Sequence, residues 1–480
     1  MTQAVSIRKN IFYSSILTIS GYLFPLLTFP YVTRVLGVAN LGICNYVDSI
    51  VQYFILFSMM GIGTTAIREV AKAKGNKVLL SRVFSSLLGL NLLFTFISIF
   101  ILIICSLTIH SLASYKEMLY IGVAKVLFNS LLIEWFYKGL EDFRYITARS
   151  LIIRVLYVMA VFILVKSPKD YIVYFSLNVV VVVINALVNL YRSRYFVNFS
   201  FRQISFKPFL FPFIALGLYS LLTSLYTSFN VAYLGFTCGE VEVGYYTVSS
   251  KLFSLILALF TAFTGVLLPR MSSLATEGKS ELFMIFANKS IDALLAFVIP
   301  LIVVSINYAP TIVRIVAGNG YEGSILPMKI IMPLMFIIGY EQILVVQILM
   351  PLKKDKAILI NSFIGALVAV ITNFLIVPTY KSIGAAIVWC VSEFIVMIAA
   401  QLFVGKCIGF HFPVMKIIKR IPIVIFLFLI CFKTYNDSLI CLILAITLSY
   451  IIDILYEYLI LKNDLICKCL DDLLKKSNKK

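Results

Sequence analysis

The stretch RVLGVANLGICNYVDSIVQYFILFSMMGIGTTAIREV, residues 34–70, decides the fold of this chain. It is an apolar run with polar groups at both ends, and about 20 apolar residues are enough for a helix to cross a bilayer. The stretch recurs at an offset of 202 residues. The matching positions are Gly42, Gly63 and Arg68 with Gly244, Gly265 and Arg270. Gly37 instead matches Gly235, at an offset of 198, which predicts a four-residue difference in the turn. We interpret the two copies as a duplicated half-protein.

Composition identifies an integral membrane protein. Of the 480 residues, 61% are hydrophobic and 13% are charged, and the mean hydropathy is +1.01, which a soluble globule does not show. The apolar runs are continuous rather than alternating, so we expect an all-α protein. About fourteen runs have the length of a transmembrane helix. No connection between them is long enough to hold an extramembrane catalytic domain.

The fourteen predicted helices divide into two lobes and an appended pair. Helices one to six fall in residues 1–200 and helices seven to twelve in residues 201–412, while helices thirteen and fourteen and a basic cytoplasmic tail fall in residues 413–480. Six helices separate the two copies, so the copies run in the same direction and the two six-helix lobes are predicted to be pseudo-symmetric. The predicted helices are 11–33, 41–67, 83–109, 117–137, 147–166, 171–191, 208–235, 243–268, 286–308, 325–350, 358–377, 383–405, 421–433 and 438–461.

Positive charge is concentrated on one side of this predicted topology. With the amino terminus inside, the inner connections hold most of the lysines and arginines, which is the positive-inside pattern. The even number of helices then places both termini in the cytoplasm. The net charge of +19 is accounted for in this way, so we expect no nucleic-acid partner.

Ionisable residues at membrane depth are the candidate functional groups, because each costs about 3 kcal/mol to insert unless it faces a cavity or a partner. A lumen that contains cations attracts an anion such as a diphosphate, since their field is weakly screened there. The candidate substrate-binding cations are Lys251, Arg154, Lys125 and Arg34. The candidate ion-coupling carboxylates are Glu341, Glu393, Asp48 and Glu134.

A structural role stays open for these residues. Arg34 and Asp48 lie nearer the outer interface, where charges anchor a helix to the membrane surface. Lys125 and Glu134 are nine residues apart on one predicted helix, so we do not expect them to pair. The residues that a buried ion pair between helices would equally explain are Lys251, Arg154, Glu341 and Glu393.

Motifs of soluble enzymes are missing from the sequence. It contains no glycine loop that cradles phosphate, no zinc-binding helix and no nucleophile elbow. His110 and His411 are too distant in sequence to indicate a metal site. We therefore expect no cofactor and no metal, and any uphill transport has to use an ion gradient or the gradient of the substrate.

Several stretches of the chain carry a family resemblance. They are NLGICNYVDSI at 40–50, AIREVA at 66–71, EWFYKGLEDFRYITARSLIIRVLYV at 134–158, VKSPKDY at 165–171, GYYTVSSKL at 244–252, LLPRMS at 267–272 and NFLIVPTYKSIGAAIVWCVSEF at 373–394. In this order, over residues 5 to about 405, the chain resembles the bacterial polysaccharide flippases of the O-antigen transporter (Wzx-like) type. That family belongs to the multidrug/oligosaccharidyl-lipid/polysaccharide exporter superfamily.

The resemblance implies two six-helix bundles around a central, V-shaped cavity. It also implies that the substrate is an oligosaccharide on undecaprenyl diphosphate, moved from the cytoplasmic to the periplasmic leaflet of the inner membrane for O-antigen, capsule or exopolysaccharide synthesis. Cationic cavity residues are expected in such flippases. The candidates inside the matching stretches include Arg154, Lys251 and Glu393, whereas Lys125 and Glu341 lie outside them.

The predicted mechanism is alternating access by rocking of the two lobes, with entry of H⁺ or Na⁺ resetting the carrier. The expected protein partners are a polysaccharide polymerase and a chain-length regulator. Two alternatives stay open. One is an ion-coupled exporter of drugs or metabolites on the same fold, which a cationic lumen disfavours because typical drug substrates are cations. The other is a membrane polysaccharide polymerase, which needs a larger outer loop than this chain offers.

Overall fold

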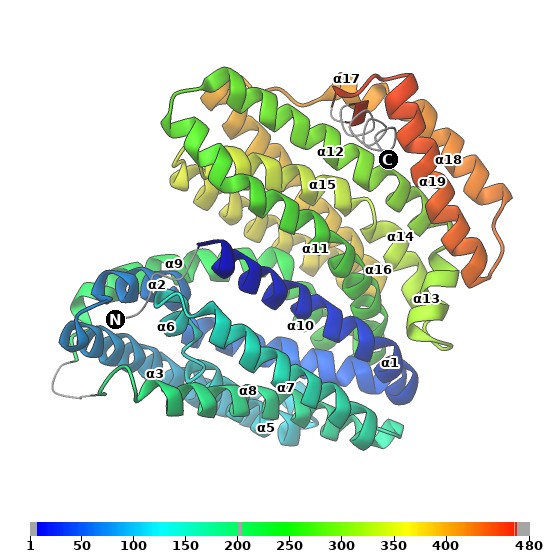
Figure 1. Ribbon diagram of the computed structural model, residues 1–480. Helices are drawn as coiled ribbons and strands as arrows, with labels where there is room; N and C mark the ends of the chain where they lie inside the picture. The colour runs from blue at the N-terminus through cyan, green and yellow to red at the C-terminus, as the bar shows by residue number, and fades with distance from the viewer. Residues whose placement is uncertain (1–6, 200–203, 465, 468–480) are drawn as a thin grey trace, which may run out of the picture. The chain divides into compact units, whose positions relative to one another are not determined.

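The computed structural model describes residues 7–199, 204–464, 466 and 467, and every structural statement below concerns these residues. Within them the chain forms helices and no strand, as predicted (Figure 1). The chain folds into two compact units, Met1–Gly244 and Tyr245–Lys480. The predicted basic tail beyond residue 467 lies outside the described residues.

The first unit is a bundle of long helices around α1. In it α1 packs against α3, α5 and α7, and α8 packs against both α5 and α7 (Figure 1). Its helices are α1 (Ile7–Met59), α2 (Ile62–Ala73), α3 (Lys77–Thr108), α4 (His110–Ala113), α5 (Lys116–Ser130), α6 (Glu134–Gly139), α7 (Phe143–Leu164), η1 (Pro168–Asp170), α8 (Tyr171–Ser193), α9 (Lys207–Thr227) and α10 (Phe229–Cys238).

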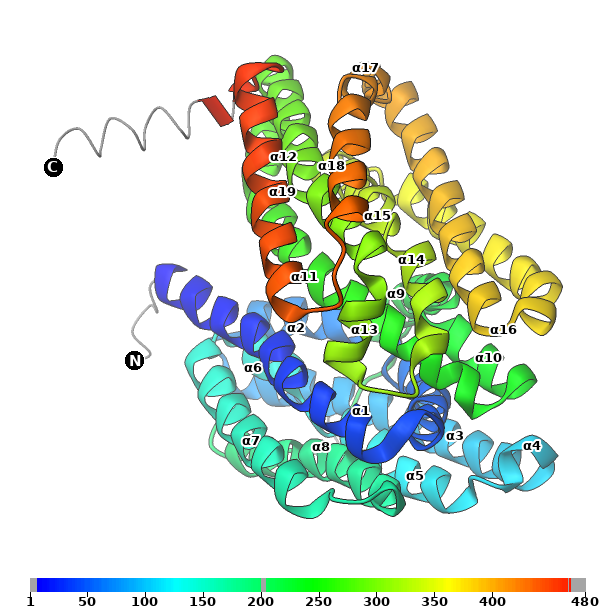
Figure 2. The same ribbon diagram turned by 90° about the vertical axis from the view of Figure 1, so that its right-hand side faces the viewer.

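The second unit has two packing centres. One is α16, which packs against α14, α15 and η4, and the other is α12, which packs against α18 and α19 (Figure 2). The helices are α11 (Glu240–Thr276), which begins at the end of the first unit, α12 (Ser280–Asn307), α13 (Ala309–Ala317), η3 (Glu322–Ser324), α14 (Ile325–Ile331), α15 (Leu334–Gln342), the π-helix η4 (Ile343–Leu349), α16 (Asp355–Ile408), α17 (Val414–Ile418), α18 (Ile421–Lys433) and α19 (Leu439–Leu459).

Several predicted helices are broken. The predicted helix 117–137 is wrong as one element, because Ile133 adopts a left-handed conformation with φ of 40° and separates α5 from α6. The predicted helix 325–350 is interrupted before Pro333, whose ring cannot follow the preceding turn in regular α geometry. The predicted helix 41–67 ends early, at Met59, and Met60 has φ of 37°. Apolarity predicts where the chain crosses the membrane, but not where the crossing is broken.

The turn near the start of the repeated stretch corrects the predicted alignment. Gly37 has φ 74° and ψ 173°, and Gly239 has φ 87° and ψ 176°. Gly239 is therefore the structural counterpart of Gly37, at the same offset of 202 as the rest of the repeat. The predicted match with Gly235, and with it the four-residue difference, is wrong, since Gly235 instead makes room for the Tyr46 ring.

The number of membrane crossings and the lobe boundary stay predictions. Among the described residues nine helices are long and apolar enough to span a membrane, and the bent pair Glu322–Ile331 and Leu334–Leu349 is a tenth candidate. Two of the nine, Phe12–Ala73 and Asp355–Ile408, are longer than one crossing needs. The compact units divide at Gly244, whereas the predicted lobe boundary at residue 200 follows the internal repeat.

Candidate functional site

An ion pair joins two of the predicted site residues in the first unit. Lys125 of α5 binds Asp48 of α1, and the side chains are 13% and 44% exposed. The helices approach closely because Gly122 leaves room for Val51: a Cβ atom on Gly122 would lie 2.4 Å from Val51 Cγ2. The sequence assigned Lys125 to substrate binding and Asp48 to ion coupling. In the structure their charges cancel.

Glu134, the first residue of α6, binds two cations. Its Oε1 atom lies 2.7 Å from Arg149 Nη2 and its Oε2 atom lies 3.5 Å from Lys138 Nζ. Lys125 is bound elsewhere, so the expectation that Lys125 and Glu134 do not pair is confirmed. Arg149 of α7 was missed by the sequence analysis, because it falls in the first turns of the predicted helix 147–166, where positive-inside charges are ordinary.

Arg149 is a buried cation whose hydrogen-bonding capacity is only partly used. Its side chain is 4% exposed, and Nη2 donates to Glu134 and, at 3.0 Å, to Ser150 Oγ. The Nε and Nη1 atoms are buried and have no acceptor in the described part of the chain. Since a guanidinium carries five N–H groups, the three on Nε and Nη1 are left without a hydrogen bond within the described residues.

Arg154 lies on the same helix and adds a third cation. Its Nη1 atom donates to the carbonyl oxygen of Leu17, at 3.0 Å, and to Ser20 Oγ, both on α1. Arg154 also interacts electrostatically with Glu134 and Arg149. Glu134, Lys138, Arg149 and Arg154 form what we call the arginine cluster. It holds three cations and one carboxylate.

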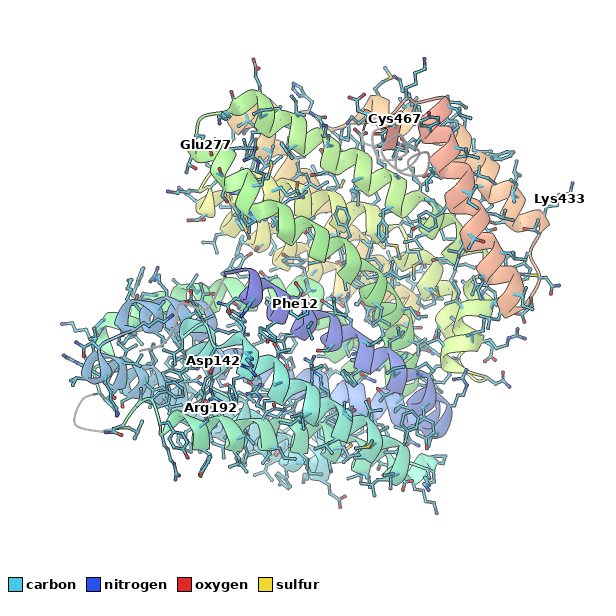
Figure 3. All side chains as sticks on the ribbon, in the orientation of Figure 1. Phe12, Asp142, Arg192, Glu277, Lys433 and Cys467 are labelled. Carbon is cyan, nitrogen blue, oxygen red and sulfur yellow. The ribbon has the colours of Figure 1, made fainter. Side chains whose placement is uncertain are left out.

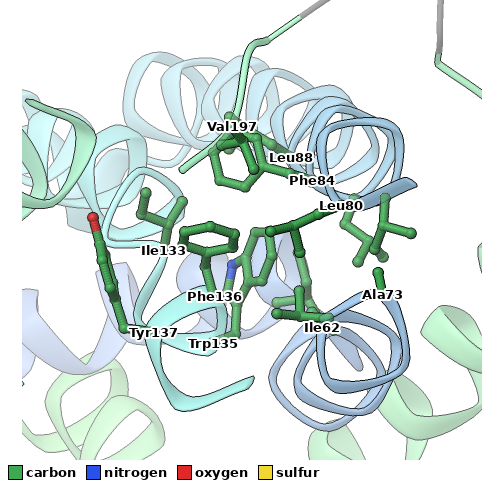
Figure 4. Packing of buried hydrophobic residues seen from close by; sticks show 14 of the residues in the cluster. Ile62, Ala73, Leu80, Phe84, Leu88, Ile133, Trp135, Phe136, Tyr137 and Val197 are labelled. Carbon is green, nitrogen blue, oxygen red and sulfur yellow. The ribbon is translucent and has the colours of Figure 1, made fainter. Parts of the chain in front are cut away.

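Aromatic packing positions the carboxylate of this cluster. Trp135 and Phe136 follow Glu134 directly and are buried against Phe84 of α3 (Figure 4). The ring centroids of Phe84 and Phe136 are 5.0 Å apart in an edge-to-face arrangement. Because Ile133 turns the chain into this core, Glu134 is held at the start of α6 and points to α7.

Polar contacts fix the start of α7. Asp142 caps the helix by accepting from the backbone N–H of Tyr145, and it binds Arg192 of α8 at 2.7 Å (Figure 3). The Arg192 guanidinium also lies 3.8 Å from the Tyr145 ring centroid. These contacts set the position from which α7 projects Arg149 and Arg154.

Two further predicted cations are exposed. Arg34 of α1 donates from Nη1 to the carbonyl oxygen of Pro30 at 2.7 Å. Lys251 of α11 belongs to the second unit and is also exposed. Neither belongs to the arginine cluster as defined above.

The predicted carboxylates Glu341 and Glu393 lie near each other in the second unit. They are on α15 and α16, and they are close enough to interact electrostatically. Glu393 is 4% exposed and accepts a hydrogen bond from Trp389 Nε1 at 3.1 Å. The Trp389 ring packs on Phe253, with the ring centroids 5.1 Å apart. In the described ranges neither carboxyl group has a cation as an ion-pair partner.

A second ionic cluster, absent from the sequence analysis, joins α12, α17, the start of α18 and α19. Arg420 binds both carboxylate oxygens of Glu457, at 2.5 and 2.8 Å. Asp292 lies 2.7 Å from Lys416 Nζ and 3.5 Å from Arg420 Nη2. The signal was available in the sequence, since Asp292 and Glu457 are carboxylates within two predicted helices.

The sequence matches a known family over more than half of its length. Residues 7–275 match the family model described as "Polysaccharide biosynthesis protein". The chain belongs to the polysaccharide biosynthesis protein family. Two relatives bear the name "Putative O-antigen transporter". The Escherichia coli (strain K12) protein is 25% identical over 84% of this chain and 98% of its own, and the Shigella dysenteriae protein is 24% identical over 82% and 98%.

The fold of this family member is that of known transporters. The lipid II flippase MurJ, in an inward closed conformation, matches with a TM-score of 0.74 and 16% identity over 94% of this chain and all of its own. A multidrug resistance MATE family transporter of the MOP superfamily, in an outward-facing conformation, matches with a TM-score of 0.53 and 14% identity over 83% and 96%. The chain thus has the fold of these multi-pass membrane proteins. Its named relatives are transporters rather than enzymes.

Proposed function

We propose that this polysaccharide biosynthesis family member is a flippase for undecaprenyl-diphosphate-linked oligosaccharides. It takes the repeat unit from the cytoplasmic leaflet of the bacterial inner membrane and releases it into the periplasmic leaflet, for O-antigen, capsule or exopolysaccharide synthesis. A polymerase and a chain-length regulator then receive the product. Support comes from the names of the relatives and from the likeness in fold to a lipid II flippase.

The observation that carries the proposal is the net positive arginine cluster. Arg149 is buried, and two of its nitrogen atoms have no acceptor in the described part of the chain. A diphosphate supplies acceptor oxygens for guanidinium groups in the geometry that arginine prefers. Arg149 and Arg154 are therefore the proposed diphosphate ligands, with Arg34 and Lys251 as exposed cations that contact the anionic substrate. Lys125 is left out of this role because Asp48 neutralises it.

Flipping of a fluorescent lipid-linked oligosaccharide in proteoliposomes tests the proposal. We expect Arg149→Gln and Arg154→Gln each to slow flipping by at least about tenfold, which corresponds to about 1.4 kcal/mol. Arg144→Gln is the matched control, because Arg144 is an exposed cation on the same helix. Wild-type rates in both cluster variants would refute the proposed diphosphate site. Export of cationic drugs without flipping would favour a drug exporter.

We also propose that Glu341 and Glu393 carry the coupling ion, H⁺ or Na⁺, during alternating access. Two carboxylates close together retain a proton or a cation more readily than either does alone. An imposed pH or Na⁺ gradient should accelerate flipping in the wild type and have no effect in Glu341→Gln. Glu281→Gln, which removes an exposed carboxylate from the same unit, should respond like the wild type. A full gradient response in Glu341→Gln would eliminate Glu341 as the carrier.

A further inference from the structure

A basic pocket lies in the second unit, at one end of α12, α18 and α19. Its volume is about 480 Å³. Five cations line it: Lys289, Lys416, Lys419, Arg420 and Lys462. Two carboxylates line it as well, Asp292 and Asp464. The excess of positive charge over negative charge marks this pocket as a site for an anion.

The inner wall of the pocket is held rigidly by the ionic cluster described above. Arg420 is 5% exposed and is clamped by Glu457, while Lys416 is held by Asp292. These two carboxylates are therefore already neutralised by cations of the wall. They do not compensate the charge at the mouth of the pocket.

The mouth of the pocket carries cations without partners. Lys289, Lys419 and Lys462 are exposed, and in the part of the chain that the structure describes none of them forms a hydrogen bond or an ion pair through its side chain. Among the described residues that line the pocket, Asp464 is the one carboxylate at the mouth, and it binds none of the three. Three ammonium groups thus face one carboxylate around an open cavity.

The segment after α19 is folded back to close one side of the pocket. Lys462 has φ of 48°, a left-handed conformation that lysine rarely adopts. This turn brings Asn463 onto Glu457: the Asn463 backbone N–H donates to the Glu457 carbonyl oxygen at 2.9 Å, and Nδ2 donates to Oε2 at 2.8 Å. The pocket is thereby preformed rather than assembled by a ligand.

An apolar groove continues from the pocket along the same two helices. Its volume is about 430 Å³, and it is lined by Pro422, Ile423, Phe426, Leu455, Leu459 and Ile460 among others. The groove lies beside the pocket in sequence: Pro422 is two residues after Arg420, which caps α18, and Ile460 directly precedes Leu461. Tyr456 lines the groove and Lys419 lines the pocket, and the Tyr456 hydroxyl donates to the Lys419 carbonyl oxygen at 2.7 Å. A basic pocket beside an apolar groove matches an amphiphile with an anionic head, not a free anion.

We propose that this pocket binds the phosphate headgroup of an anionic membrane phospholipid, whose acyl chain lies in the groove between α18 and α19. The predicted topology places the pocket at the cytoplasmic side, where basic pockets between transmembrane helices bind anionic headgroups. The site is built entirely from the second unit and shares no residue with the arginine cluster. It concerns a resident lipid rather than the transported substrate.

Lipid retention by the purified full-length protein tests this site. Native mass spectrometry would count the phosphatidylglycerol molecules retained from mixed phosphatidylglycerol and phosphatidylcholine nanodiscs, and a titration would give the affinity. We expect the triple variant Lys289→Gln, Lys419→Gln and Lys462→Gln to bind phosphatidylglycerol at least about tenfold more weakly than the wild type. The matched control is Lys353→Gln, Lys354→Gln and Lys356→Gln, which removes the same charge from exposed positions of the same unit. The control should bind like the wild type.

A competition experiment distinguishes a lipid headgroup from a free phosphate as the ligand of the pocket. Soluble glycerol phosphate in millimolar excess should not displace phosphatidylglycerol, because it lacks the chain that fills the groove, and Phe426→Ser should weaken lipid binding without altering any charge. Equal losses in the triple variant and its control would overturn the proposal. So would displacement by glycerol phosphate, or unchanged affinity in a triple variant whose melting temperature shows that it is folded.

Discussion

Gly42 of α1 and Gly244 of α11 lie at the same helix crossing. A Cβ atom on Gly42 would lie 1.8 Å from the carbonyl oxygen of Glu240, and one on Gly244 would lie 2.4 Å from the carbonyl oxygen of Val38. Glu240 and Val38 are themselves 202 residues apart, the offset of the repeat. The contact is therefore reciprocal, because each glycine packs against the carbonyl oxygen four residues before the other glycine.

Gly42→Ala and Gly244→Ala should each lower the stability of the protein, because a methyl group at either position overlaps backbone atoms that cannot move away cheaply. Overpacking of this kind costs about 1–3 kcal/mol. The measurement is the melting temperature in detergent by fluorescence-detected size exclusion. Gly63→Ala and Gly265→Ala are controls from the same repeat, since nothing lies within 4 Å of a Cβ atom at either glycine. An equal decrease in melting temperature for all four variants would show that the close packing at the helix crossing does not cause the destabilisation.

A double-mutant cycle on Glu134 should rank its two cation partners. The contact between Glu134 and Arg149 is short, and the Arg149 side chain is buried. Lys138 lies one helical turn from Glu134, its Nζ atom is 3.5 Å from the carboxylate, and the side chains of Lys138 and Glu134 are each about one third exposed. We expect a coupling energy of about 1–3 kcal/mol for Glu134 with Arg149 and about 0.5 kcal/mol for Glu134 with Lys138. Coupling energies of the same size would contradict the assignment of Arg149 as the main partner.

Removal of one partner of the Lys125 and Asp48 pair should be worse than removal of both. Lys125→Met leaves the half-exposed Asp48 carboxylate without its cation, at a cost of about 1 kcal/mol, while Lys125→Met combined with Asp48→Leu leaves no charge behind. Melting temperature measures the stability, and proteoliposome flipping measures the transport. A double variant that is stable and active makes the pair structural. A stable double variant that does not flip returns Lys125 or Asp48 to the transport site.

Two buried carboxylates of α19, Glu457 and Asp453, should respond unequally to neutralisation. Glu457→Gln removes the charge that clamps Arg420 and should cost about 3 kcal/mol. Asp453 is fully buried on α19, and neither of its carboxylate oxygens has a hydrogen-bond partner in the described part of the chain. Asp453→Asn should therefore be neutral or stabilising in a thermal melt. A large decrease in the melting temperature of Asp453→Asn would instead indicate that a cation binds to the Asp453 carboxylate.

The helices could be predicted from the sequence because helix formation in a membrane depends on the residues of one segment. An apolar run of sufficient length has to form a helix in lipid, since every backbone N–H and C=O must be satisfied within the segment. The breaks did not follow, because they depend on contacts that are distant in sequence. Gly61, for example, begins α2 after the break at Met60, and its N–H bonds to the carbonyl oxygen of Phe213 at 2.9 Å.

The sequence indicated only part of the candidate site, and it did not indicate the pairs. It singled out Glu134 and Arg154 of the arginine cluster, and also Lys125 and Asp48, which the structure pairs with each other. Which partner each one takes depends on close approaches such as Gly122 to Val51, which leave no signal in a single sequence. Arg149 escaped notice because the same amino acid serves as an ordinary topological signal near a helix end.

The break at Met60 has a mechanical consequence when the two copies of the repeat are compared. In the first copy the helix stops at Met59 and restarts at Ile62, while in the second copy α11 continues through the equivalent residues to Thr276. Bending at this level of the repeat is therefore expected at the break between α1 and α2, whereas the continuous helix α11 resists bending at the equivalent residues.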